Sequence, residues 1–325
     1  MKNRREFLFL YDVSWANPNG DPMDENKPRV DEETGINIVT PDRLKRTIRD
    51  TLVEWGYDVF LREIRKEDMT LMDKKDILTE YYDGKIDNVI KKAIDIRLFG
   101  GTFAIDSGKR GGKRKEGEGE ITEKARGLTG PVQFKFGCSL HMVKPVLIKG
   151  SSVMPSEGQK DKTQGSLPER WVVPYSLIVF YGIANEKASK FFNEKGELIG
   201  ELTDDDINIM LKALWFGHKG STDIISYSKF GHEPRLLIEI IYKEGVLSHM
   251  GELDKLVSIE TDKRDEEIRD IEELTLSLEK LKERVAKYKD KLFKVRYAIS
   301  DRLKIEPDIE NVFESITVEE FEWMK

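Results

Sequence analysis

The first strand of the chain constrains the fold more than any other segment. Residues 6–14 have the sequence EFLFLYDVS, in which apolar side chains occupy both sets of alternating positions. The two faces carry, in turn, Phe7, Phe9, Tyr11 and Val13, and then Leu8, Leu10 and Asp12. This pattern predicts a strand that is buried largely on both sides.

That strand leads into a loop that suits neither a strand nor a helix. Residues 17–22 have the sequence NPNGDP, in which two prolines, a glycine and two asparagines block regular structure. Further along, Thr40 followed by Pro41 has the chemistry of a helix start, with an N-cap residue before a proline at the first helical position. We therefore predict a helix from Pro41 to about Trp55.

The predicted helix is amphipathic and basic. Its apolar stripe, suited to packing on a sheet, is formed by Leu44, Ile48, Leu52 and Trp55. The neighbouring arc, beside the stripe rather than opposite it, carries Lys45, Arg46 and Arg49. Such a helix would bring a row of bases to the rim of the sheet.

The order of the predicted elements indicates the fold class. After the first strand and helix come strands near residues 132–142 and 171–185, a helix at 203–217 and a strand at 234–243. This is the ferredoxin-like βαββαβ order that RNA-recognition domains share, so we predict an α+β fold.

Three decorations are predicted around this core, which would comprise residues 1–57 and 131–250. Residues 58–130 suggest a helical insertion that ends in a glycine- and lysine-rich loop, which is too polar to bury surface and should be mobile. Residues 145–171 form a protrusion between the two middle strands. Residues 251–325 form a C-terminal helical extension.

The C-terminal extension carries a heptad pattern. Its apolar residues alternate at spacings of three and four: Ile271, Leu274, Leu278, Leu281, Val285, Tyr288, Leu292 and Val295. The pattern predicts a long amphipathic helix that packs on its own domain or in a helical hairpin. A coiled coil with a second protein is the alternative, which the shortness of the repeat disfavours.

The strand at residues 132–142 alternates between apolar and polar side chains. We expect a core face formed by Val132, Phe134, Phe136, Cys138, Leu140 and Met142. We expect a polar face that carries Gln133, Lys135, Ser139 and His141. Cys138 would then be an inert thiol in the core.

Composition is that of a folded protein without a membrane span. The 325 residues are 38% hydrophobic and 35% charged, and no apolar run approaches the roughly 18 residues that a span needs. A single cysteine and an N-terminal apolar run too short for a signal peptide favour a cytoplasmic protein. The net charge of −7 is distributed unevenly, with bases predominating at 109–126 and acids at 305–321.

The common catalytic signatures do not occur in the sequence. The four histidines are scattered, there is no CxxC pair, and neither a GxSxG nor a Walker A motif is present. We therefore predict no catalytic residue, no metal site and no cofactor.

RNA binding is the function class that remains. Basic side chains beside an irregular loop are suited to binding phosphates, and a polar sheet face is suited to binding a strand of RNA. An apolar residue in the protrusion could wedge between nucleobases. The candidate RNA-binding residues are Asn17, Asn19, Arg43, Lys45, Arg46, Arg49, Gln133, Lys135, Ser139, His141, Met154, Lys219, Ser221 and Lys229. For any single basic residue, a solvated surface charge is the simpler interpretation. The polar sheet face could equally be an ordinary solvated surface. Met154 could pack under its own loop.

Five segments in this order resemble one protein family: FLYDVSWANPNGDP, VTPDRLKRTIRD, DIRLFGG, LTGPVQFKFGCSLH and SYSKFGHEPRLLIEIIY. Together they are similar to the CRISPR-associated backbone subunits (RAMP superfamily, seventh family) of type I Cascade complexes, most of all the type I-B form. The resemblance extends from the first strand to about Lys243.

The resemblance implies a non-catalytic subunit that binds CRISPR RNA and polymerises along the guide beside other Cascade subunits. The guide bases would stay free to pair with target DNA. The βαββαβ core would be the palm, the helical insertion the fingers and the protrusion the thumb, with Met154 as a wedge that displaces bases.

The resemblance also implies roles near the first loop. Lys45, Arg46 and Arg49 would hold phosphates, and Asn17 and Asn19 would shape the loop that meets them. We expect that loop to leave the sheet without closing into a hairpin, and to present backbone amides to RNA through positive φ angles.

Two other functions stay open. A metal-dependent target-RNA endonuclease of the type III backbone kind would use Asp21 or Asp24, although capping of a turn is the simpler role for Asp21. A protein scaffold without an RNA role is the other alternative.

Overall fold

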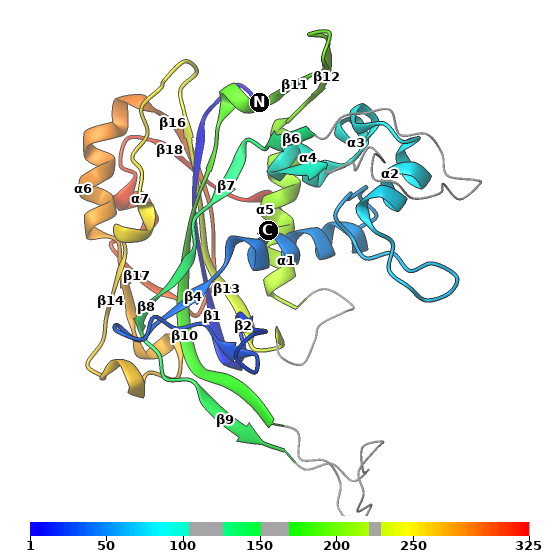
Figure 1. The fold of residues 1–325 in the computed structure, drawn as a ribbon. Helices are drawn as coiled ribbons and strands as arrows, with labels where there is room; N and C mark the ends of the chain where they lie inside the picture. Colours follow the sequence, from blue (N-terminus) through cyan, green and yellow to red (C-terminus); the bar gives the residue numbers. More distant parts are fainter. Residues whose placement is uncertain (104–125, 151–168, 221–228, 325) are drawn as a thin grey trace, which may run out of the picture.

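β1 (Arg5–Ala16) lies in the middle of the main sheet and pairs antiparallel with β13 (His232–Tyr242) and with β10 (Glu169–Ala184). The computed structural model describes residues 1–103, 126–150, 169–220 and 229–324 (Figure 1). Every residue of β1 from Arg5 to Val13 is buried. This confirms the prediction of a strand enclosed on both sides.

The main sheet is mixed, with strands in the order β18-β16-β13-β1-β10-β8-β4. Neighbouring strands are antiparallel except β16 and β18, which are parallel. The outer strands are β4 (Ile36–Val39), β8 (Gly137–Met142), β16 (Leu292–Ile299) and β18 (Thr317–Glu320). Two short strands, β7 (Val132–Phe134) and β9 (Val146–Lys149), pair with other parts of β10. The fold is therefore α+β, as predicted.

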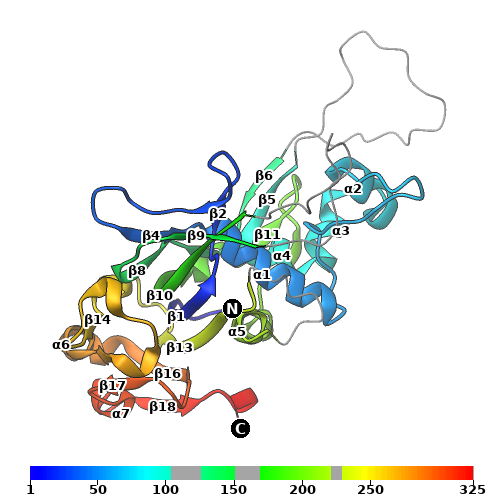
Figure 2. The same cartoon turned by 90° about the horizontal axis from the view of Figure 1, so that it is seen from below.

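Both faces of the sheet are covered. α1 (Pro41–Glu54) and α5 (Asp204–His218) lie on one face, and the C-terminal segment with α6 (Glu279–Tyr288) and α7 (Ile309–Val312) lies on the other (Figures 1 and 2). The side chains of β1 alternate between two hydrophobic cores. The core on the α1 and α5 side contains Phe7, Phe9, Tyr11 and Val13. The core on the C-terminal side contains Leu8 and Leu10.

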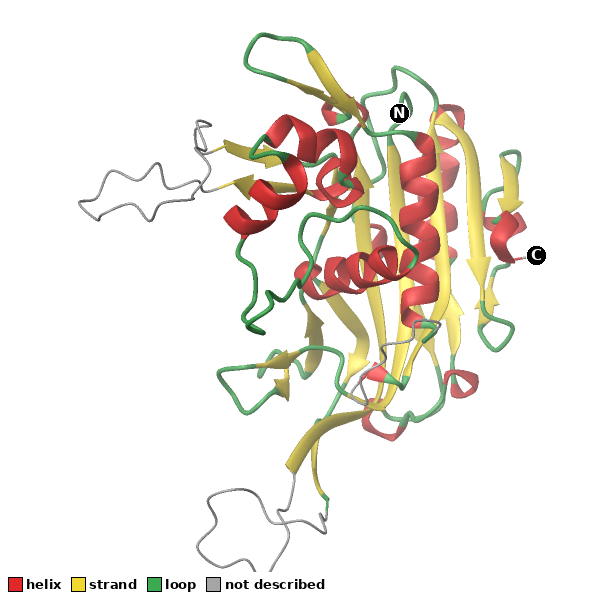
Figure 3. Ribbon diagram, turned by 90° about the vertical axis from the view of Figure 1, so that its right-hand side faces the viewer, coloured by secondary structure: helices red, strands yellow, loops and turns green. Residues whose placement is uncertain are grey.

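The two helices begin where their capping residues predict. The Thr40 hydroxyl accepts a hydrogen bond from Arg43 N at the start of α1 (3.2 Å). At the start of α5, Thr203 and Asp206 form a reciprocal capping box. α5 crosses α1 in front of the sheet (Figure 3), and a Cβ at Gly217 would contact the Thr51 side chain. Glycine at that position therefore lets the two helices approach closely.

The insertion after α1 is helical, as predicted, and has a hydrophobic core of its own. Its elements are α2 (Lys74–Tyr82), α3 (Ile86–Lys92), α4 (Ile94–Phe99), β5 (Gly100–Phe103) and β6 (Arg126–Thr129). Phe60, Tyr82 and Phe103 pack together in this core, and Phe191 joins them. Phe191 comes from the hairpin of β11 (Lys190–Phe192) and β12 (Leu198–Glu201). The predicted glycine- and lysine-rich loop lies mostly outside the described residues.

The loop after β1 differs from the prediction. It closes into a small hairpin of its own, in which β2 (Gly20–Asp21) pairs with β3 (Lys27–Pro28). Positive φ angles occur at Trp15, Glu25 and Asn26 rather than at the NPNG residues. Gly20 is needed for space instead, because a Cβ there would lie 2.6 Å from Asn26 O. The predictions of an open loop and of a nest built on positive φ angles at these residues are therefore wrong.

The prediction of one long C-terminal helix is also wrong. The heptad residues are almost all buried, but they do not lie on one helix. Ile271 belongs to a short helical turn (Ile271–Glu273), Leu274 and Leu278 flank β15 (Thr275–Ser277), and the others lie on α6 and β16. β15 pairs with β14 (Ser258–Glu260) and with β17 (Lys304–Glu306). β16 extends the main sheet beside β13. The spacing thus identified buried positions and not the element that buries them.

The alternation predicted for residues 132–142 breaks in the middle. β7 ends at Phe134 and β8 begins at Gly137, so the phase shifts across the two exposed residues between them. Cys138 and Met142 are consequently exposed, whereas Ser139 and His141 are buried. The predicted core and polar faces are therefore exchanged along β8, and Cys138 is not a core thiol.

Among the described residues, no helix is both long enough and apolar enough to cross a membrane.

Candidate nucleic-acid interface

Two basic residues of α1, Lys45 and Arg46, already interact with other side chains of the protein. Arg46 Nε donates to both carboxylate oxygens of Asp50 at 2.8 and 2.9 Å, and its Nη2 donates to Glu63 Oε1 at 3.2 Å. These carboxylates raise the pKa of Arg46. Lys45 Nζ lies 5.5 Å from the centroid of the Phe99 ring, and burial lowers the pKa of its ammonium group. The charge of Arg46 is thus largely balanced before any ligand binds.

Arg49 joins α1 to the helical insertion. Its guanidinium lies over the Phe99 ring, 5.2 Å from the centroid, and its Nε donates to Asp95 Oδ2 at 3.1 Å. Asp95 is fully buried and also accepts hydrogen bonds from the backbone N–H groups of Phe60 (2.8 Å) and Leu61 (3.2 Å). This geometry gives Arg49 a structural part in holding the insertion.

Arg43 and Lys229 form a cation pair of a different kind. Within the described residues neither side chain makes an ion pair with a carboxylate, and burial lowers the pKa of Arg43. Burial lowers the pKa of Lys229 to about 7, and the nearby charge of Arg43 contributes to that shift. Lys229 Nζ donates to the backbone carbonyls of Asn17 and of Pro18 (2.9 Å for the latter). Lys229 therefore lies beside the NPNG loop, close enough to Arg43 for their charges to interact.

A stack of buried rings lies under the cation pair. The rings of His218 and His232 are nearly parallel, with centroids 6.4 Å apart, and Tyr11 contacts both. Burial lowers the pKa of His218 to about 3 and lowers that of His232 well below its usual value. These histidines are neutral near pH 7. The positive charge at this place thus comes from the cation pair.

The asparagines of the loop fix its shape. Asn19 Oδ1 accepts a hydrogen bond from Thr40 N at 2.8 Å, which ties the loop to the start of α1. Asn17 Nδ2 donates to Asn26 O at 2.6 Å across the small hairpin. In the part of the chain that the structure describes, Asn17 Oδ1 and His232 Nε2 are buried without a hydrogen-bond partner. Several polar groups thus converge where β1 ends.

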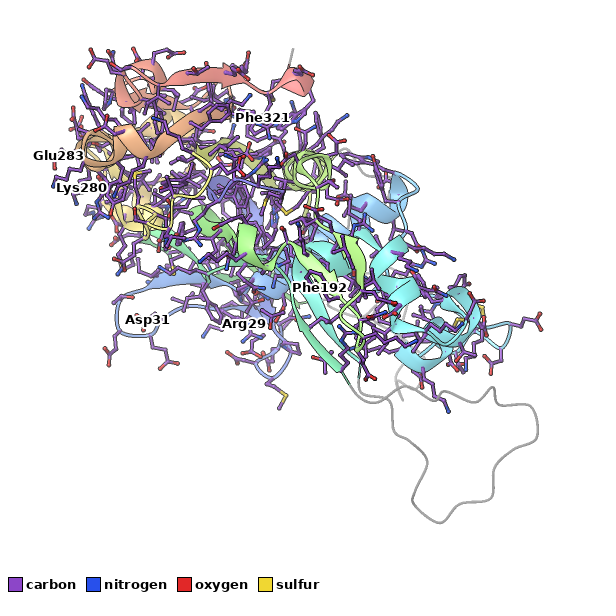
Figure 4. All side chains as sticks on the ribbon, turned by 90° about the horizontal axis from the view of Figure 1, so that it is seen from above. Arg29, Asp31, Phe192, Lys280, Glu283 and Phe321 are labelled. Carbon is purple, nitrogen blue, oxygen red and sulfur yellow. The ribbon has the colours of Figure 1, made fainter. Side chains whose placement is uncertain are left out.

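One acidic residue of the loop, Asp21, is used for structure. Asp21 Oδ1 accepts a hydrogen bond from Met23 N at 3.0 Å, and Asp21 Oδ2 pairs with Arg29 Nη1 at 2.7 Å. The capping role predicted as the simpler one for Asp21 is therefore present. Asp24 is exposed. Arg29 and Asp31 lie on the adjoining segment before β4, at the edge of the molecule (Figure 4).

The sheet-face candidates do not join this site. Ser139 Oγ donates to His141 O at 2.6 Å, and His141 Nε2 accepts from Leu177 N at 3.3 Å, both in the interior. Lys135 Nζ is paired with Asp254 at 2.7 Å. The C-terminal segment supplies Asp254, and Ser139 and His141 are buried, so the predicted free polar face for RNA is not formed.

The remaining candidates are scattered. Gln133 Nε2 donates to Gly130 O at 2.9 Å, away from the loop. Lys219 is exposed just after α5. Met154 and Ser221 lie outside the described residues, although the base of the predicted protrusion is a two-stranded ladder of β9 and β10.

Sequence reasoning missed two exposed aromatic residues beside the cation pair. Trp15 and Phe230 are 55% and 78% exposed. The only signal for Trp15 in the sequence was an aromatic residue near the end of an otherwise buried strand. Desolvated cations without carboxylates, next to aromatic faces, are chemically suited to phosphates and bases.

Comparisons with known proteins agree on one family. The profile of CRISPR-associated protein Cas7 matches residues 3–279. A Haloferax volcanii protein named CRISPR-associated protein Cas7 is 27% identical over 315 residues, which cover 94% of this chain and 89% of that protein.

Chains of two solved structures were also matched. A chain of a CRISPR RNA-guided surveillance complex, pre-nicking, has a TM-score of 0.49 at 9% identity, and the match covers 98% of this chain and 96% of that one. A chain of a CRISPR RNA-guided surveillance complex has a TM-score of 0.46 at 13% identity, covering 95% and 96%.

Proposed function

The chain belongs to the CRISPR-associated Cas7 family, and on that basis we propose that it is a non-catalytic backbone subunit that binds CRISPR RNA in a type I Cascade complex. Several copies would line the guide, beside other Cascade subunits, and leave its bases free to pair with target DNA. The sequence segments that resemble the type I-B form make that subtype our choice.

The arrangement of elements supports a division into palm, fingers and thumb. The core elements β1, α1, β8, β10, α5 and β13 follow the order expected of a βαββαβ palm, and its four strands lie in the order β13-β1-β10-β8. The fingers would be residues 58–130, and the thumb residues 145–171. The C-terminal residues, 251–325, would close the second face of the palm.

The observation that carries the RNA-binding proposal is the cation pair. Arg43 and Lys229 are already largely desolvated and have no carboxylate partner among the described residues. An RNA phosphate at this place would form charge-assisted hydrogen bonds without having to displace a carboxylate. A basic residue of α1 that is already paired with a carboxylate, such as Arg46, would first have to lose that carboxylate partner.

Binding of this kind is set by charge and not by base sequence. Each phosphate contact to a single strand releases counterions, so the logarithm of affinity falls with the logarithm of salt concentration by about 0.7 per contact. The double variant Arg43→Gln/Lys229→Met should lose roughly one to two phosphate contacts, which would reduce this slope by about 0.7 to 1.4. Arg46→Gln is a matched control on the same helix, because Arg46 is already paired with Asp50 and Glu63.

The direct test is the nucleic acid that the protein carries. Protein purified from cells that contain a CRISPR array should have an absorbance ratio raised by bound RNA, and that RNA should be one discrete species of guide length. Protein that carries no RNA, and binds no oligoribonucleotide in dilute buffer, would refute the proposal. Incubation with guide, complementary RNA and Mg²⁺, with Asp21→Ala as a control, tests the absence of endonuclease activity.

A further inference from the structure

A strained tryptophan stands at the end of β1. Trp15 has a φ angle of 50°, in the left-handed region that bulky side chains avoid. The residues before it alternate regularly, with Tyr11 and Val13 in the core below α1 and α5. The next position in that alternation belongs to Trp15, yet it is Ala16 that is buried in that core and Trp15 that is 55% exposed. The left-handed residue therefore turns a large aromatic ring out of the core and into solvent.

A second exposed aromatic residue lies on the neighbouring strand end. Phe230 is 78% exposed and precedes Gly231. Ser14 N donates to Gly231 O at 2.9 Å, and a Cβ at Gly231 would collide with Ser14 O. The close approach of these two backbones brings the segments that carry Trp15 and Phe230 side by side.

The cation pair adjoins the same two segments. Lys229, directly before Phe230, donates through Nζ to the carbonyls of Asn17 and Pro18, directly after Trp15 and Ala16. Within a few residues of chain on each side, the structure thus combines two exposed rings with a desolvated ammonium group. Aromatic faces beside cations are the combination that binds unpaired nucleotides, because bases stack on the rings while the cations hold the phosphates.

We propose that Trp15 and Phe230 form a stacking site for an unpaired nucleobase, whose adjoining phosphate is held by the cation pair. This inference rests on the proposed RNA binding and adds to it the class of group recognised, which is the flat face of a base. Strained backbone conformations are retained mainly where function uses them. Exposing Trp15 for a ligand gives this conformation a use.

The test compares oligomers with and without bases. The probes are a short oligoadenylate and an abasic ribose-phosphate oligomer of the same length and charge. Both are so short that only one protein molecule can bind each oligomer. Trp15→Ala should lower affinity for oligoadenylate by about 5- to 150-fold, the range expected when a stacking aromatic residue is replaced by alanine. Affinity for the abasic oligomer should not change. Trp15→Phe should restore most of the lost affinity, and oligoadenylate should quench wild-type tryptophan fluorescence.

Phe293→Ala is the matched control, since Phe293 is also exposed (57%) but lies on β16. It should leave both affinities unchanged. Equal binding of oligoadenylate by wild type and Trp15→Ala would overturn the stacking site while leaving the proposed function intact, and so would an equal loss for both oligomers. A change in self-association alone would also overturn it, because it would assign Trp15 to contacts between copies. Failure of wild type to bind either oligomer would refute the proposed function itself.

Discussion

Lys229 should make RNA affinity depend on pH in a way that a single substitution removes. Burial lowers the pKa of its ammonium group to about 7, so the free protein carries this charge fully only below that pH. Two of the three N–H groups of the ammonium donate to the carbonyls of Asn17 and Pro18. The third has no acceptor among the described residues, and we assign it to a phosphate oxygen.

The size and sign of the effect follow from linkage. A bound phosphate favours the charged form and raises the pKa of Lys229, so complexes formed above pH 7 take up a proton. Affinity should therefore fall as pH rises above 7, by up to about tenfold per pH unit, which corresponds to about 1.4 kcal/mol. Below pH 7 the affinity should level off. The charge of the RNA backbone is constant over this range.

Stability should change in the opposite direction. The unfolded chain binds a proton at Lys229 up to the ordinary lysine pKa of 10.5, whereas the folded protein releases it near pH 7. Between these values the unfolded state binds more protons, so the free protein becomes more stable as pH rises. This opposition separates a direct electrostatic effect on binding from a loss of folded protein.

The assay is fluorescence anisotropy of a labelled oligoribonucleotide between pH 6 and 9, at fixed ionic strength, on wild type and Lys229→Met. The variant should bind more weakly at pH 6, with a salt slope reduced by about 0.7, and its affinity should be nearly flat with pH. Lys280→Met is the control, since Lys280 is an exposed lysine of α6, far from the loop (Figure 4). If Lys229→Met keeps the pH dependence of wild type, the assignment of the titrating group is wrong.

Three further predictions concern stability, measured by urea unfolding. Arg49→Ala should cost about 3–5 kcal/mol, because it leaves the buried Asp95 carboxylate without its cation, and it should affect unfolding more than RNA affinity; a change in affinity alone would contradict this. Glu6→Gln should cost about 1–3 kcal/mol, because the buried carboxylate accepts hydrogen bonds from two tyrosine hydroxyls and two backbone N–H groups; an unchanged midpoint would show that these bonds are dispensable. Trp15→Gly should leave the free protein equally stable or up to about 1 kcal/mol more stable, because glycine adopts positive φ without strain, whereas Phe293→Gly, in an ordinary strand conformation, should be destabilising.

The parts of the fold that could be predicted from sequence are those fixed by local chemistry. Thr40 and Pro41 specify the start of α1, and Thr203 with Asp206 specifies the start of α5. The two apolar faces of β1 required a cover on each side, which the structure supplies. None of these signals depends on residues that are distant in the chain.

The errors arose where distant contacts decide the structure. The heptad pattern marks buried residues equally well in a helix or in alternating short elements, and the strand-forming run LFKVRYAI at residues 292–299 was hidden within it. On β8 the change of phase occurs at Gly137, where the ring of Phe180 leaves no room for a Cβ. Neither event has a clear signature in the nearby sequence.

The candidate site shows the same division. The sequence located Asn17 and Asn19 in the first loop and included Arg43 and Lys229 among the candidates, but it assigned the phosphates at that loop to Lys45, Arg46 and Arg49. It could not distinguish Arg43 from Arg49, because the carboxylate that pairs with Arg49 comes from the insertion, at Asp95. The tertiary structure thus determines which basic residues remain available to bind RNA.

The strands contributed by the C-terminal segment have a practical consequence for anyone trimming the protein. A polypeptide stopped at residue 279, where the family match ends, would lack β16 and β18 and would leave β13 with a bare edge of unpaired N–H and C=O groups. It would also uncover Leu236, Ile238 and Ile240 on the second face. Such a fragment should form sticky, irregular aggregates, which in light scattering could be mistaken for ordered assembly along RNA.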